Sequence, residues 1–264
     1  MLKDRFVGRR FEIRNFYSGS HLRYDGSGHI KHSAEKGDWT IAQFRVERVK
    51  ARAADFELSG SRIAVVYDER KDRVNFSTLD ALDIKVDLPA AAITESKLDE
   101  LTNEIFVDLK KEPDKVPDYW RDLVSENVAS EIGKDGKKTY RLKDIPLCDP
   151  APPSDAVQIM TRTSQGIPIY SGTGRVKPAI EKKTPDPSFS DLARRFKYQG
   201  TTVMSVTISE EGNVEHISML RPLGLGLDER AVDAVKTWTF IPAKLDDKPV
   251  KVMANIEVTF RLYN

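Results

Sequence analysis

The sequence predicts an α+β protein of two domains, and three observations support this prediction. Apolar and polar residues alternate in short stretches through the first part of the chain, as in antiparallel strands. Eight of the fourteen prolines then fall between Pro146 and Pro187, in a composition typical of a linker. The remaining residues alternate strand and helix patterns. We therefore expect a β-rich domain over residues 1–145, a connector over 146–187 and a small domain over 188–264.

The N-terminal domain is predicted to be an antiparallel sheet with one buried face. One strand is indicated by four alternating apolar residues, Leu82, Ile84, Val86 and Leu88. Between residues 44 and 51 the apolar positions change phase, which indicates a bulge or a bend. Ser59-Gly60-Ser61 separates two alternating stretches and predicts a hairpin turn. These patterns together predict a meander of six or more strands.

Two helices are expected after these strands. Thr94 can cap the first helix, and Pro113 would end it. Its buried stripe is predicted to consist of Leu98, Leu101, Ile105, Phe106 and Leu109. Pro117 can begin a second, shorter helix that buries Trp120.

The C-terminal domain is predicted to follow the order helix, strand, strand, helix, strand. Ser190 can cap the first helix, and the Gly212-Asn213 turn joins the first two strands. A long alternating stretch from Val250 to Leu262 predicts the last strand, with one buried and one solvent-exposed face. An antiparallel sheet packed on two helices would bury every apolar stripe.

Composition limits the classes of function. Among 264 residues, 42 are Lys or Arg and 41 are Asp or Glu, so a basic surface for nucleic acid is not expected. No apolar run is long enough to span a bilayer, and the residues after Met1 do not resemble a signal peptide. We therefore expect either a cytosolic protein or one whose targeting segment has been removed.

The C-terminal segment resembles the TonB C-terminal domain family. The most specific match is Trp238-Thr239-Phe240-Ile241-Pro242 after an amphipathic helix, followed by Lys248-Pro249-Val250. The resemblance extends from about Gly174, where Val176-Lys177-Pro178 matches the lead-in segment of such proteins, to Asn264. This chain departs from the family at Phe189-Ser190, where many members have Tyr-Pro, and the departure bears on partner specificity.

The resemblance implies a periplasmic protein of energy-coupled transport. Its partner would be a peptide segment of an outer-membrane receptor, bound as an added strand. A membrane helix preceding Met1 would add an inner-membrane proton-motive complex as a partner. Two alternatives stay open: a small-molecule carrier, if the N-terminal strands close into a barrel with an apolar interior, and a periplasmic scaffold without a transducing role.

No catalytic, cofactor or metal site is expected. His21, His29 and His32 flank a glycine-rich turn without acidic or thiol partners at ligand spacing. Cys148 has no nearby histidine or second cysteine, so we expect a structural or incidental thiol. We therefore predict a binding protein and not an enzyme.

The start of the last strand is the predicted peptide-binding edge. It consists of Lys251, Val252, Met253, Ala254, Asn255 and Ile256. From Val252 to Ile256 this strand has neither charge nor proline, the usual protections of an exposed edge. Its backbone would therefore be a template for strand addition. The alternative is that the connector, or a second copy in a homodimer, already covers the edge.

Overall fold

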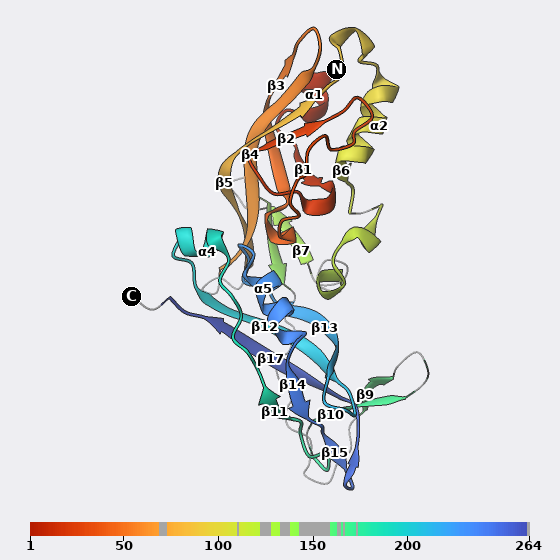
Figure 1. The fold of residues 1–264 in the computed structure, drawn as a ribbon, viewed down its shortest axis with the longest axis vertical. Helices are drawn as coiled ribbons and strands as arrows, with labels where there is room; N and C mark the ends of the chain where they lie inside the picture. Colours follow the sequence, from red (N-terminus) through yellow and green to blue (C-terminus); the bar gives the residue numbers. More distant parts are fainter. Residues whose placement is uncertain are drawn as a thin grey trace. The chain divides into compact units, whose positions relative to one another are not determined.

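The computed structural model describes residues 1–68, 73–109, 111–121, 128–132, 138–142, 159–162, 165, 167–172 and 174–262. The chain divides into two compact units. Unit 1 comprises Met1–Asp68, Val74–Pro117 and Gly224–Gly226, and unit 2 contains the C-terminal sheet. Each unit combines a sheet with short helices (Figure 1). The predicted α+β fold class is therefore confirmed.

Unit 1 is built on a six-strand half-barrel sheet (Figure 1). The strands are β1 (Arg10–Ile13), β2 (His21–Tyr24), β3 (Gln43–Ala51), β4 (Phe56–Asp68), β5 (Arg73–Val86) and β6 (Phe106–Val107). Their order is β6-β1-β3-β4-β5, and β2 also pairs with β5. β1 pairs antiparallel with β3 and β6, and β3 with β4, as predicted, whereas β2 runs parallel to β5.

The expected turn at Ser59-Gly60-Ser61 is wrong, because these residues lie inside the continuous strand β4. A Cβ at Gly60 would lie 2.0 Å from the Arg45 carbonyl oxygen of β3. The register between β3 and β4 shifts next to it, between Val46 and Arg48, so the predicted bulge is confirmed. Glycine is therefore needed here for close approach of two backbones and not for a turn.

Helix α2 (Glu95–Ile105) packs against the sheet of unit 1. The Lys97 N–H donates to Thr94 Oγ1 over 3.1 Å, so the predicted cap is confirmed. The shared core contains Leu98, Leu101 and Ile105 of α2 together with sheet residues such as Phe44, Leu58, Leu82 and Ile84. The helix is shorter than expected, because Phe106 is extended and begins β6.

Short elements complete the N-terminal half of the chain. Helix α1 covers Leu2–Phe6, and 3₁₀ turns cover Arg14–Phe16, Trp39–Ile41, Ala90–Ala92 and Pro113–Lys115. The chain is helical from Asp118 to Arg121, as expected after Pro117, and Trp120 is buried. β7 (Val128–Ile132) and β8 (Lys138–Leu142) form an antiparallel pair. Cys148 lies outside the described residues.

Unit 2 is built on a five-stranded sheet in the order β13-β12-β17-β10-β9. Its elements are β9 (Ile159–Arg162), β10 (Pro168–Ser171), β11 (Ile180–Lys183), α4 (Asp191–Arg195), β12 (Gly200–Ile208), β13 (Val214–Arg221), α5 (Leu227–Val235), β14 (Thr239–Ile241), β15 (Lys244–Leu245), β16 (Lys248–Pro249) and β17 (Val252–Phe260). β11 pairs with β14, and β15 with β16, in two small ribbons outside this sheet.

The predicted core of the C-terminal domain is confirmed, but its sheet is mixed. β12 pairs antiparallel with β13 and β17, as expected, whereas β10 pairs parallel with β17. The Ala193 N–H donates to Ser190 Oγ over 3.1 Å, which confirms the predicted cap of α4. α5 buries Leu227, Ala231 and Val235. Among the described helices, none is long and apolar enough to cross a membrane.

Candidate peptide-binding edge of the C-terminal sheet

The long strand β17 has two sides that are paired very differently. On one side β12 pairs with it in continuous register, from Ile208 opposite Val252 to Gly200 opposite Phe260. On the other side β10 pairs only with the start of β17, where Tyr170 lies opposite Val252 and Ser171 opposite Met253. Among the described residues, no further strand lies beside β17 on this second side.

The direction of the backbone groups along β17 follows from two hydrogen bonds. The Lys251 carbonyl accepts from the Tyr170 N–H over 2.9 Å, so Lys251 faces the β10 side. The Leu262 N–H donates to the Gln199 side chain, beside the start of β12, over 3.2 Å. Because successive residues of a strand face alternate sides, the backbone groups of Met253 and Glu257 face the side of β17 opposite to β12.

The six residues predicted as the site lie together at the start of β17. Val252 and Ile256 have their side chains in the core, at 1% and 9% exposure, and Asn255 is exposed. Lys251 pairs with Glu215 of β13 at 2.6 Å. Val252 and Met253 are also the residues that lie opposite Tyr170 and Ser171 of β10, whereas Ala254, Asn255 and Ile256 pair with β12 alone among the described strands.

Two shallow cavities flank the far end of β17. One, of about 400 Å³, is lined by Asp186, Pro187, Phe189, Thr259, Phe260 and Arg261. The other, of about 440 Å³, is lined by Gln199, Gly200, Thr201, Thr259, Phe260, Arg261 and Leu262. The Phe189 ring contacts the Phe260 ring edge-on at 5.3 Å between centroids. The departure from the family at Phe189 therefore lies beside the end of this strand.

The segment before α4 is tied to the rest of unit 2 through Trp238. The Trp238 indole N–H donates to the Pro185 carbonyl over 3.0 Å, and its ring lies 6.5 Å from that of Phe240. Trp238 is 9% exposed and belongs to the core. The Trp-x-Phe motif thus fixes the chain segment that leads to Phe189.

β10 lies within the predicted extended connector, where no strand was expected. A weak signal was present, because Ile167 and Ile169 alternate with Pro168 and Tyr170. Ile169 is buried at 7% exposure, and β9 pairs antiparallel with the outer side of β10. Four residues are too few to distinguish a strand from a loop by periodicity.

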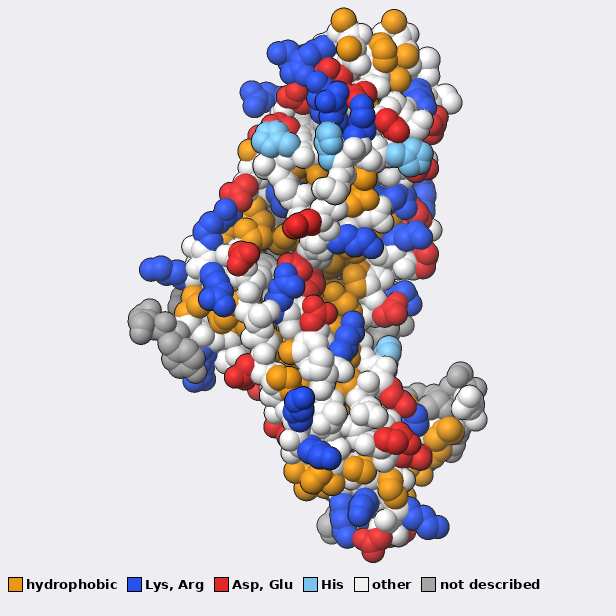
Figure 2. All heavy atoms as spheres, viewed as in Figure 1, with side chains coloured by type: hydrophobic (Ala, Val, Ile, Leu, Met, Phe, Trp, Pro, Cys, Tyr) orange, Lys and Arg blue, Asp and Glu red, His pale blue; other side chains and the backbone are white. Residues whose placement is uncertain are grey.

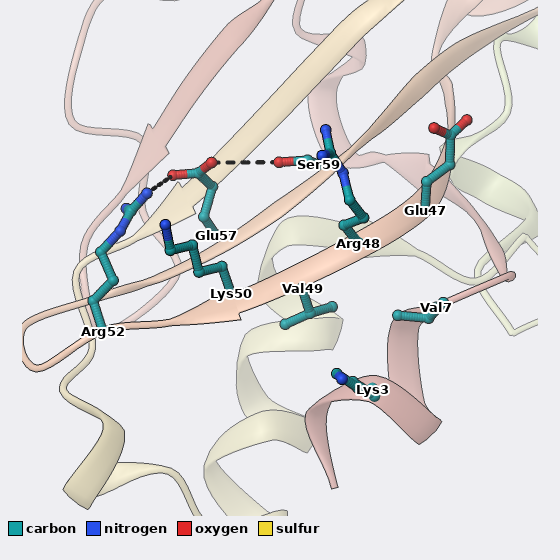
Figure 3. Close-up of a pocket in the computed structure, with 9 residues that line it drawn as sticks. All are labelled: Lys3, Val7, Glu47, Arg48, Val49, Lys50, Arg52, Glu57 and Ser59. Atoms are coloured by element: carbon teal, nitrogen blue, oxygen red, sulfur yellow. Dashed lines mark hydrogen bonds and ion pairs between the residues drawn. The ribbon is translucent and has the colours of Figure 1, made fainter.

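A cavity of about 610 Å³ in unit 1 lies against β3, β4 and α1 (Figure 3). Its lining consists of Lys3, Val7, Glu47, Arg48, Val49, Lys50, Arg52, Glu57 and Ser59. Arg52 pairs with Glu57 at 2.7 Å, and the Ser59 hydroxyl donates to the same carboxylate. Ligand pockets are mostly apolar, whereas only Val7 and Val49 are apolar here, so we assign no ligand to this groove.

The interior of the half-barrel is relevant to the carrier alternative, which needs an apolar cavity inside the N-terminal domain. Leu98, Leu101 and Ile105 of α2 pack against the buried face of the sheet. Side chains of the protein therefore occupy the space that the carrier alternative assigns to a small molecule.

The three histidines considered as metal ligands, His21, His29 and His32, are exposed on the surface of unit 1. His21 lies 3.6 Å from Asp83, and His29 lies 3.8 Å from Asp25. Within the described ranges, no group of three or more His, Cys, Asp or Glu side chains could hold a metal ion. On the face in Figure 2, cationic and anionic side chains are interspersed over most of the surface.

Comparison with known proteins identifies the C-terminal segment. Residues 185–262 match the family described as Gram-negative bacterial TonB protein C-terminal. The chain is similar to "Protein tonB2" of Pseudomonas aeruginosa, with 34% identity over 79 residues, which cover 30% of this chain and 29% of that protein. It is also similar to "Protein TonB" of Vibrio cholerae, with 32% identity over 106 residues, which cover 39% of this chain and 42% of that protein.

These relatives are matched over less than half of their length, and the matched family region contains α4, β12, β13, α5 and β17. The strands β9, β10 and β11, and the whole N-terminal sheet, lie before it. The expected resemblance is thus confirmed for the part of the chain that forms the candidate edge. The segment from residue 185 to residue 262 is a TonB C-terminal domain.

Proposed function

We propose that this chain is a periplasm-facing, TonB-type energy transducer whose C-terminal domain binds an extended segment of an outer-membrane receptor as an added strand on β17. One observation supports this proposal above the others. β17 is paired with β12 along its whole length, yet on its other side the described strands cover only Val252 and Met253. A long strand with one open side is the surface that strand addition requires.

The residues along the open side suit an extended peptide. Backbone groups of alternate residues face outward, so they can form a ladder with any sequence, and selectivity must come from side chains. An added strand that reaches the end of β17 would meet the cavity of about 400 Å³ beside Phe189 and Arg261. The aromatic ring and the guanidinium group would favour a peptide with an apolar and an acidic residue there.

Glu257 offers a direct test of the binding edge. Its side chain is exposed, and its N–H faces away from β12 by the alternation along β17. Glu257→Pro therefore removes one N–H on the open side of β17. The N–H groups that β17 directs toward β12 remain. Glu257→Ala is the matched control, because it removes the same carboxylate and keeps the N–H.

The probe is a fluorescein-labelled peptide with the periplasm-facing N-terminal segment of an outer-membrane receptor from the same bacterium. By fluorescence anisotropy we expect Glu257→Pro to weaken binding at least on the order of tenfold, the effect of losing about one hydrogen bond and its alignment, and Glu257→Ala to change it little. Circular dichroism must show that both variants are folded. Equal affinity of the two variants would contradict the proposed edge.

A further inference from the structure

We infer that β10 is an internal competitor for the edge of β17, which an incoming strand must displace before it can pair with Lys251–Met253. This inference rests on the proposed strand addition and concerns its regulation. Tyr170 and Ser171 already lie opposite Val252 and Met253 in parallel register. The Tyr170 N–H also donates a hydrogen bond to the Lys251 carbonyl over 2.9 Å. A peptide strand at the same place would need the same backbone groups.

β10 is attached to β17 by a short stretch only. Two of its residues pair with β17, whereas the β12 ladder extends over the nine residues of β17. Pro168, at the start of β10, has no N–H to donate, and Ile169 is the one buried side chain of β10. Few hydrogen bonds and little buried apolar surface are the marks of an element that opens locally.

The chain just after β10 is anchored much more firmly. Val176 is buried at 1% exposure, and Lys177 exchanges two backbone hydrogen bonds with Lys244, at 2.8 and 3.0 Å. The Arg175 guanidinium also pairs with Asp246 at 2.7 Å. Because Ser171 is only four residues from Arg175, a displaced β10 stays close to the edge.

This arrangement combines easy release with rapid return. A segment tethered by a few residues has a high effective concentration at its docking site, so β10 competes well with a free peptide despite its short pairing. The apparent affinity for a peptide falls by the fraction of molecules with an open edge. β10 covers only Lys251, Val252 and Met253 of the edge, since its pairing with β17 ends at Met253.

Removal of the Tyr170 donor tests this inference in the full-length chain. Tyr170→Pro removes the N–H that the Lys251 carbonyl accepts, and Tyr170→Ala is the matched control that loses the ring and keeps the donor. We expect Tyr170→Pro to bind the receptor peptide on the order of tenfold more tightly than the unmodified chain, if the edge is open in about one molecule in ten. Tyr170→Ala should bind it as the unmodified chain does.

Amide hydrogen exchange provides a readout that does not depend on the peptide. In Tyr170→Pro the Met253 amide, which faces β10, should exchange faster. The amides of Ala254 and Ile256, which face β12, should be unchanged and show that the sheet is intact.

A disulfide gives the opposite perturbation. Ser171→Cys and Met253→Cys, combined with Cys148→Ser, would join the facing residues of β10 and β17. We expect the oxidised form to bind the receptor peptide more weakly than the same protein after reduction.

The outcomes separate this inference from the proposed function. If the peptide binds the unmodified chain, Tyr170→Pro and both redox forms equally, strand addition stands and the competitor role of β10 is overturned. If no variant binds the peptide, the proposed function has failed and the inference fails with it, even where Met253 exchange responds to Tyr170→Pro.

Discussion

At the scale of single residues, Glu12 has an environment that its sequence position does not reveal. Its side chain lies in β1 at 7% exposure, and one carboxyl oxygen has no hydrogen-bond partner among the described residues. Burial raises the pKa of Glu12 from 4.5 to about 8, against a smaller lowering by the Gln43 side chain. A buried carboxyl group of this kind is protonated at neutral pH, because the charged form is poorly solvated.

We predict that Glu12 makes the protein less stable as the pH rises. Since its pKa is higher in the folded than in the unfolded state, its contribution is fully present below pH 4.5 and is lost as the pH rises through about 8. Over this window the free energy of unfolding should fall by at most about 1.4 kcal/mol per pH unit on its account. Urea unfolding of the unmodified chain and Glu12→Gln across this range measures the effect, and parallel pH profiles would contradict it.

At the scale of elements, local signals were predictable and strand partners were not. Thr94 and Ser190 cap the expected helices, since a cap depends on residues three positions apart. The phase change before Arg48 likewise predicted a bulge. By contrast, the parallel pairing of β2 with β5 and of β10 with β17 joins segments far apart in sequence. Alternation shows that a segment is a strand, and it does not show which strand lies beside it.

Gly60 illustrates the same limit. A glycine between two alternating stretches fits a turn and a strand equally well when only the sequence is read. What decides is the Arg45 carbonyl, which lies 2.0 Å from where a Cβ would be. The candidate site shows both sides of this limit, because the last strand was predictable from its own residues and its partial cover by β10 was not.

Trp238 connects three elements, and its removal should be costly for that reason. It joins the end of α5 to the segment before α4 through the Pro185 carbonyl and packs beside Phe240 of β14. We predict that Trp238→Ala lowers the free energy of unfolding by about 3–5 kcal/mol. Trp238→Phe, which keeps a ring and loses the N–H, should cost about 1 kcal/mol. Thermal or urea unfolding measures both, and a cost below about 1 kcal/mol for the alanine variant would argue against a core role.

At the scale of the whole molecule, the chain joins a recognisable C-terminal domain to an N-terminal sheet outside the matched family region. The two-domain organisation over 1–145 and 188–264 stays a prediction, which the masses of fragments from limited proteolysis would check. The connector is the more informative part of that prediction, since it contributes β9, β10 and β11 to unit 2. A boundary drawn from proline content therefore underestimates how much of the connector folds.

The open side of β17 also allows two copies of the protein to associate, to an extent that depends on protein concentration. Two copies related by a twofold axis could pair antiparallel through this edge, and the facing residue numbers must then add to an even number, because alternate residues face outward. A register centred on Glu257 places two like charges opposite each other and is disfavoured. One centred on Ile256 instead places Asn255 opposite Glu257.

We expect weak, reversible dimers that sedimentation velocity detects as a rise in mean mass with concentration, and that Glu257→Pro abolishes. A single mass at every concentration would mean that the edge does not pair with itself. If the dimer forms, peptide and second copy exclude each other, so the measured affinity for a peptide will decrease as the protein is concentrated.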